Sequence, residues 1–96
     1  MRARLLYREK FIYADGAIRE MVLWQLPLTS GEKTAALKYR LFYGTADGTC
    51  LLRYDNEKGK GHHRHALDLE EPYRFTDVDT LVKDFLEDIE RMREMK

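Results

Sequence analysis

Cysteine and long hydrophobic runs are almost absent from this sequence of 96 residues. Cys50 is the only cysteine, so the chain cannot form an internal disulfide or a zinc site built from cysteines. The longest uncharged apolar stretch, residues 21–28, includes Gln25 and Pro27. Because a membrane-spanning helix needs about 20 apolar residues, the sequence predicts no membrane segment.

The N-terminal residues also lack the apolar core of a signal peptide, since charges interrupt every short apolar run of MRARLLYREKF. Together with the lone cysteine, this predicts a cytoplasmic protein. The net charge is zero, yet residues 1–65 contain 12 Lys and Arg against 7 Asp and Glu, whereas residues 66–96 contain 5 against 10. This asymmetry indicates either nucleic-acid contact by the basic part or a helix with an acidic outer face.

Strand patterns occupy most of the chain, which shows no repeat or linker and is interpreted as a single domain over residues 1–96. Asp15-Gly16 and Asp47-Gly48 supply the turn chemistry of two hairpins, and Pro72 would close the last strand. Alternation of apolar and charged residues predicts strands near residues 5–13, 18–26, 37–43, 49–54 and 62–69.

The last segment has helical spacing instead, and we predict an amphipathic helix from about residue 77 to about residue 94 with Thr76 as its N-cap. Four charged residues are expected to face outward: Asp84, Glu87, Asp88 and Arg91. The predicted fold is therefore α+β: an antiparallel curved sheet of about five strands, followed by a C-terminal amphipathic helix packed on one face.

Large aromatic residues are numerous for so small a sheet. One helix is not expected to cover all of them, so some would line a groove or a second interface, which favours a homodimer. Alternatively, they simply fill a small core. The aromatics concerned are Tyr7, Tyr13, Trp24, Tyr39, Phe42 and Tyr43.

The segment YDNEKGKGHHRHALDLEEPYRF, residues 54–75, concentrates positive charge around two glycines. Gly59 and Gly61 would let the backbone approach an anion closely. Three cations, Lys58, Lys60 and Arg64, could bind phosphate. The Gly-Lys-Gly run lacks the frame of a nucleotide-triphosphate P-loop.

Histidines beside this loop add the means to move protons near neutral pH. Metal-independent RNA cleavage needs a base for the 2′-hydroxyl, an acid for the 5′-oxygen and cations for the phosphorane. His63 and His65 could supply the first two, and Lys60 and Arg64 the third. His62 would assist substrate binding together with Lys58, Gly59 and Gly61, while Tyr54 could stack on a base and Asp55 could orient a histidine.

Two other interpretations of the segment stay open. His63 and His65 lie two residues apart on a predicted strand and could share a metal with Asp55 or Asp68. Alternatively, the segment is a solvated hairpin whose polar residues have no further role. No cofactor is expected in the first interpretation.

The segment resembles the signature of the TumE family, small bacterial and archaeal toxins of toxin–antitoxin modules. The similarity extends to the strand-rich N-terminal half and to Asp84-Phe85 in the final helix. The quoted signature comprises Tyr54-Asp55-Asn56, Gly59-Lys60-Gly61, His63-Arg64-His65 and Glu71-Pro72-Tyr73-Arg74-Phe75.

This resemblance implies a toxin paired with a helix-turn-helix antitoxin of the TumA kind and directed against RNA or translation. Joined to the chemistry of the residues, it predicts a metal-independent endoribonuclease, an mRNA interferase. The alternatives are a module that binds nucleic acid or a partner without cleavage, and a metal-dependent nuclease.

Overall fold

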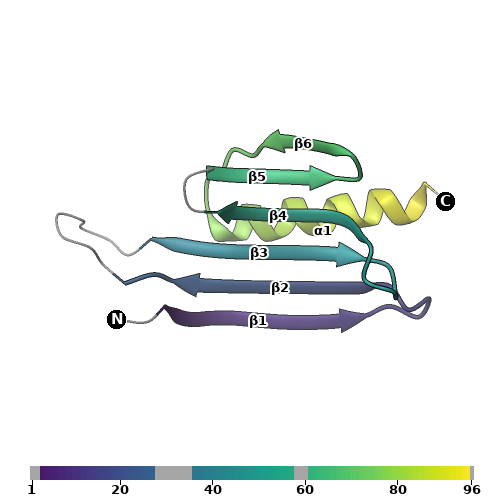
Figure 1. Ribbon diagram of the computed structural model, residues 1–96, viewed down its shortest axis with the longest axis horizontal. Helices are drawn as coiled ribbons and strands as arrows, with labels where there is room; N and C mark the ends of the chain where they lie inside the picture. The colour runs from purple at the N-terminus through teal and green to yellow at the C-terminus, as the bar shows by residue number, and fades with distance from the viewer. Residues whose placement is uncertain (1–2, 28–35, 58–60, 96) are drawn as a thin grey trace.

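A computed structural model describes residues 3–27, 36–57 and 61–95, and in it six strands form one antiparallel sheet in chain order (Figure 1). The strands are β1 (Arg4–Ile12), β2 (Ile18–Gln25), β3 (Leu37–Gly44), β4 (Cys50–Glu57), β5 (Gly61–Ala66) and β6 (Leu69–Pro72). The helix α1 (Val78–Glu94) follows them and packs on one face of the sheet. No helix among the described residues is long and apolar enough to cross a membrane.

The α+β class and the C-terminal helix agree with the prediction, but the count of about five strands was one too low. The predicted strand over residues 62–69 is divided by a turn at Leu67-Asp68, after which β6 pairs back on β5. Leu67 adopts a positive φ of 55°, a conformation that glycine or asparagine would have signalled better in the sequence. The turn was therefore not recognisable from residue type.

The core lies between α1 and the sheet face that it covers. Because side chains alternate along a strand, Tyr39, Leu41 and Tyr43 of β3 all point to this face and are buried. They pack in one cluster with Leu81 and Phe85 of the helix. The residues between them in β3 point to the opposite side of the sheet, which α1 does not cover (Figure 1). We call this side the uncovered face.

The N-cap of the helix lies one residue later than predicted. Asp77, not Thr76, is the N-cap: its backbone is extended and its carboxylate accepts a hydrogen bond from the Thr80 N–H at 2.7 Å. An aspartate at this position also suits the positive end of the helix dipole. Accordingly, the hydrogen bonds to Thr80 lower the pKa of Asp77.

Asp88 was predicted to face outward, and the structure contradicts this: only 6% of the residue is exposed. It lies on the same helical face as Leu81 and Phe85, so its carboxylate enters the layer between α1 and the sheet. There Arg64 Nε donates to Asp88 Oδ2 at 2.7 Å, and the Tyr54 hydroxyl donates to the same oxygen. Arg91 donates to Oδ1 from one helical turn away.

These partners decide the charge state of Asp88. Burial alone would raise the pKa of its carboxyl, but the hydrogen bonds from Arg64, Tyr54 and Arg91 outweigh burial and lower the pKa below its ordinary value of 3.8. The ionised carboxylate therefore stabilises the fold at neutral pH. A buried pair of this kind is costly to break, because the remaining charge keeps no partner.

We predict that Asp88→Asn lowers the free energy of unfolding by about 3–5 kcal/mol at pH 7, measured by urea denaturation. The pKa of Asp88 is lower in the folded state, so its contribution is complete above pH 3.8 and is lost as the pH falls through the folded value. The difference between wild type and variant should therefore shrink in acid. Glu87→Gln, at an exposed neighbour, is the control, and an equal loss in both variants would contradict the assignment.

Candidate functional site

The predicted site residues of β5 point to two different faces of the sheet. Arg64 pairs across the strands with buried Tyr54, so it shares the helix-covered face with His62. His63 and His65 take the other parity and lie on the uncovered face. Lys58, Gly59 and Lys60, the remaining predicted loop residues, lie outside the described part of the chain.

Arg64 joins β5 to its neighbours on the helix-covered face. Besides its bond to Asp88, it donates from Nη1 to Glu71 Oε1 at 2.9 Å. Burial alone would lower the pKa of Arg64, but the hydrogen bond and negative charge of Asp88 raise it above its ordinary value. Its guanidinium is thus engaged by two carboxylates on the side of the sheet away from His63 and His65.

Tyr54 belongs to the same buried layer. Its ring contacts Phe85 of the helix and Tyr73 edge to face, with centroids 5.7 Å and 4.9 Å away. Burial and its hydrogen bond to Asp88 raise the pKa of the Tyr54 phenol, which therefore stays protonated as a donor. This packing leaves the ring no free face for stacking on a base.

His62 fills a layered aromatic cluster on the helix-covered face. Its ring stacks on Phe75 with a centroid distance of 5.0 Å and an interplanar angle of 7°, and on Tyr39 at 5.6 Å. Burial and the nearby charge of Asp55 raise the pKa of Tyr39. The protonated Tyr39 hydroxyl and His62 Nδ1 share a hydrogen bond of 2.8 Å.

His63 has a defined tautomer. Its Nδ1 lies 3.0 Å from the backbone carbonyl oxygen of Gly61, which can only accept a hydrogen bond. Nδ1 must therefore carry the proton in this contact, and the lone pair of a neutral ring is on Nε2. Gly61 has a φ of 77°, which suits glycine at the start of β5.

His65 differs from His63 in the surroundings of its Nδ1 atom. Its Nδ1 is buried and has no hydrogen-bond partner among residues 3–27, 36–57 and 61–95. No hydrogen bond to this atom therefore fixes the tautomer of His65. The two histidines of the uncovered face thus differ at Nδ1, which has an acceptor in His63 and no partner among the described residues in His65.

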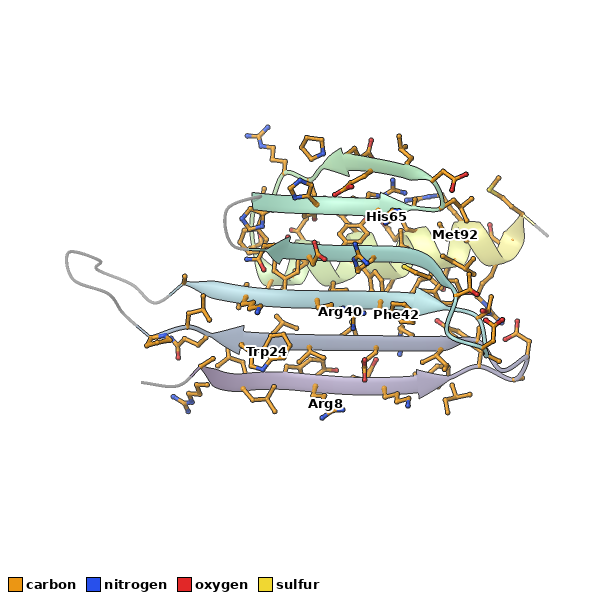
Figure 2. All side chains as sticks on the ribbon, in the orientation of Figure 1. Arg8, Trp24, Arg40, Phe42, His65 and Met92 are labelled. Atoms are coloured by element: carbon orange, nitrogen blue, oxygen red, sulfur yellow. The ribbon has the colours of Figure 1, made fainter. Side chains whose placement is uncertain are left out.

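Cross-strand pairing sets cationic and acidic side chains beside these histidines. In one row, Arg40 of β3 pairs with Asp55 of β4, which pairs with His63. In the next row, Phe42 pairs with Arg53, which pairs with His65. Directly opposite residues have Cβ atoms about 5 Å apart, so each histidine has a charged residue as its cross-strand neighbour. Figure 2 shows Arg40, Phe42 and His65 on these strands.

Arg53 connects the two rows. Its Nε lies 3.0 Å from Asp55 Oδ2, so the two side chains form an ion pair. The Nε–H of Arg53 does not point at this oxygen and makes no hydrogen bond among the described residues. Asp55 thus forms an ion pair with a cation of its own strand and stands opposite His63 in the strand register. Its predicted role in orienting a histidine stays a prediction, because the described hydrogen bond of His63 goes to the Gly61 carbonyl.

A shallow groove of about 380 Å³ opens beside these rows. Trp24 lies at its β2 end, and the Lys38 ammonium sits 5.8 Å from the Trp24 ring centroid. Asn56 also lines the groove. Its side chain accepts a hydrogen bond from the Tyr39 N–H and donates one to the Leu37 carbonyl. The lining residues are Trp24, Lys38, Tyr39, Arg40, Arg53, Asp55 and Asn56.

Several of these groove residues were not among the sequence-predicted site residues. Trp24, Lys38, Arg40 and Arg53 come from three strands, and only the pairing register brings them near the histidines. Their alternation with buried residues was a visible signal that they share one face. No group of three metal-ligating side chains occurs in the described part of the chain.

We predict that His62→Ala and His63→Ala differ in their effect on stability. Removal of His62 leaves the buried Tyr39 hydroxyl without its partner and opens the stack, so the free energy of unfolding should fall by about 1–3 kcal/mol. His63→Ala should change it by less than about 0.5 kcal/mol. Thermal or urea denaturation measures both, and equal losses would contradict the separation of faces.

Comparison with known proteins identifies a family. Neither the curated proteins nor the solved structures include a match to this chain. The family model of Toxin TumE, however, matches residues 2–93, which span every strand and nearly the whole helix. This confirms the resemblance seen in the sequence, and a toxin family in turn suggests an antitoxin partner. The chain belongs to the TumE family of toxins.

Proposed function

We propose that this toxin acts on RNA as a metal-independent endoribonuclease whose site lies on the uncovered face across β3, β4 and β5. One observation carries the proposal: this face brings two histidines together with cations and aromatic rings. The proposed substrate is RNA in the cytoplasm. The partner is an antitoxin of the helix-turn-helix TumA kind.

The cations and rings suit a single-stranded nucleic acid. Lys38, Arg40 and Arg53 can contact successive phosphates, while Trp24 offers a ring on which a base can stack. Phe42, covered by Arg40 at 5.4 Å, adds a second ring on the neighbouring row. A β-sheet surface that combines cations with aromatic side chains is a known platform for unstacked RNA bases.

The two histidines divide the proton transfers between them. His63 Nε2 removes the proton of a ribose 2′-hydroxyl, and the resulting oxygen attacks the adjacent phosphorus. The bond from phosphorus to the 5′-oxygen then breaks, and the imidazolium form of His65 gives one proton to that oxygen and returns to the neutral ring. The products are a 2′,3′-cyclic phosphate and a 5′-hydroxyl. Two residues apart on a strand, the histidines are spaced by about 7 Å, so they can flank one phosphate.

Arg53 is the described cation best placed to stabilise the phosphorane, because it stands opposite His65 on β4. Lys60, with Lys58 and Gly59, stays in the proposal as a phosphate-binding residue on chemical grounds alone. Arg64 is given a different role, since its guanidinium is bound to carboxylates on the other face. It positions β5 and hence both histidines.

The prediction of a homodimer also stays open. Trp24 and Phe42 would be covered by bound RNA in the present proposal, whereas a second copy of the chain would compete for the same face. Added RNA should therefore shift any dimer toward a monomeric complex, as measured by light scattering.

Substitution of the histidines tests the proposal. His63→Ala and His65→Ala should each lower the rate of cleavage of a labelled single-stranded RNA by about 100- to 10,000-fold, because each removes one proton transfer. Growth inhibition on expression should fall in parallel. Lys83→Ala, at an exposed site on α1, is the control and should cleave like wild type. If both histidine variants cleave RNA normally, the site assignment is wrong; if wild type binds RNA without cutting it, the protein is a binding module.

Chelation tests the absence of a metal requirement. Cleavage by the purified wild type should continue at an unchanged rate in excess EDTA, since the proposed steps use only side chains. Loss of activity in EDTA with recovery on adding Mg²⁺ or Mn²⁺ would instead support a metal-dependent nuclease. In that case His63, His65 and Asp55 would be the first ligands to examine.

A further inference from the structure

The strand β1 concentrates exposed apolar surface at one edge of the sheet. Its large apolar side chains are 46–61% exposed, and they make up most of the exposed large hydrophobics in the described part of the chain. Successive side chains of a strand point to opposite faces, so these residues leave apolar surface on both sides of the edge strand. The residues are Leu5, Leu6, Tyr7, Phe11 and Ile12.

This edge also offers a long row of backbone groups. Among the described residues, no strand pairs with the outer side of β1, a strand of nine residues. The opposite edge, β6, has only four residues and ends at Pro72. Long apolar edges invite strand addition, and proteins normally shorten or cover them. β1 therefore has the length, the free backbone groups and the apolar side chains to accept a further strand.

The exposed charge along this edge is mainly positive. Arg4, Arg8 and Lys10 are exposed; Arg8 forms a long ion pair with Glu20 at 3.9 Å, and Glu20 also stands opposite Lys10 on β2. The only acidic residue of β1, Glu9, is neutralised by Arg19, whose Nε and Nη2 donate to it at 3.1 Å and 2.9 Å. An added strand should therefore present acidic side chains opposite Arg8 and Lys10.

A second copy of the chain does not fit this requirement. When two β1 strands pair antiparallel about a two-fold axis normal to the sheet, same-face residues stand opposite each other. A register centred on Arg8 sets that residue against itself, one centred on Glu9 sets Arg8 against Lys10, and one centred on Lys10 sets lysine against lysine. Like charges in directly opposite positions destabilise a strand pair. The charges of β1 thus disfavour self-association along this edge in these three registers.

We propose that the outer edge of β1 is the docking site for the antitoxin, which adds an extended segment to the sheet beside β1. In that segment, acidic residues alternate with apolar ones: the acidic residues face Arg8 and Lys10, and the apolar ones lie beside Tyr7 and Phe11. The edge is four strands from β5, about 19 Å away, so this docking is separate from the proposed proton transfers, although the groove residue Trp24 lies on the neighbouring strand β2.

Two labelled peptides test the proposal by fluorescence anisotropy. One has ten residues that alternate valine with glutamate, and the other has lysine in place of glutamate. Wild type should bind the glutamate peptide at least tenfold more tightly than the lysine peptide. Arg8→Glu combined with Lys10→Glu should reverse this preference, and Arg8→Gln with Lys10→Gln, a milder change, should abolish it. Equal affinity for the two peptides, or binding of neither, would overturn the proposal.

The matched control reverses two exposed charges elsewhere, Arg74→Glu with Lys83→Glu, and should keep the wild-type preference. Cleavage of RNA by both reversed variants should equal that of wild type, which separates a failure at the edge from a failure of the RNA proposal. Light scattering supplies the last outcome. If wild type forms a dimer that Arg8→Glu with Lys10→Glu dissociates, the edge binds a second copy and the antitoxin assignment is wrong.

Discussion

The ion pair between Arg64 and Asp88 is the interaction on which the arrangement of the site depends. Side chains alternate along β5, so a strand that turns Arg64 toward the helix must turn His63 and His65 to the uncovered face. A slip by one residue would leave the buried Asp88 carboxylate without its main partner, at a cost of several kcal/mol. The pair therefore fixes both the helix position and the facing of the histidines.

Several residues that carry the family resemblance reinforce this helix-covered layer. Glu71 binds Arg64, Tyr73 donates to Asp84 of α1 at 2.6 Å, and Phe75 stacks on His62. They join β5, β6 and the segment before α1 to the helix. Much of the signature is thus a scaffold, and its two outward histidines are the part left available for chemistry. A contiguous motif in a strand necessarily divides its residues between two faces.

The sequence allowed prediction of the elements whose apolar pattern is clear, such as β3 and α1. It was insufficient at β5 and β6, because GHHRHALDLEE is polar on both faces and the positive-φ turn position is filled by Leu67 instead of glycine or asparagine. Asp88 was misplaced for a related reason: its partner, Arg64, is 24 residues away and no local pattern pairs them. Likewise, Trp24 and Arg53 join the site only through strand register.

The charge asymmetry of the chain acquires a spatial meaning in this fold. The two explanations left open by the sequence are compatible, since Asp79, Glu87 and Glu90 are exposed on α1 while Arg40 and Arg53 lie on the opposite face. With no net charge, the protein gains little long-range attraction to RNA. The separation of charge instead favours approach with the uncovered face toward the phosphates and the helix turned away. Orientation rather than overall attraction would then present RNA to the histidines.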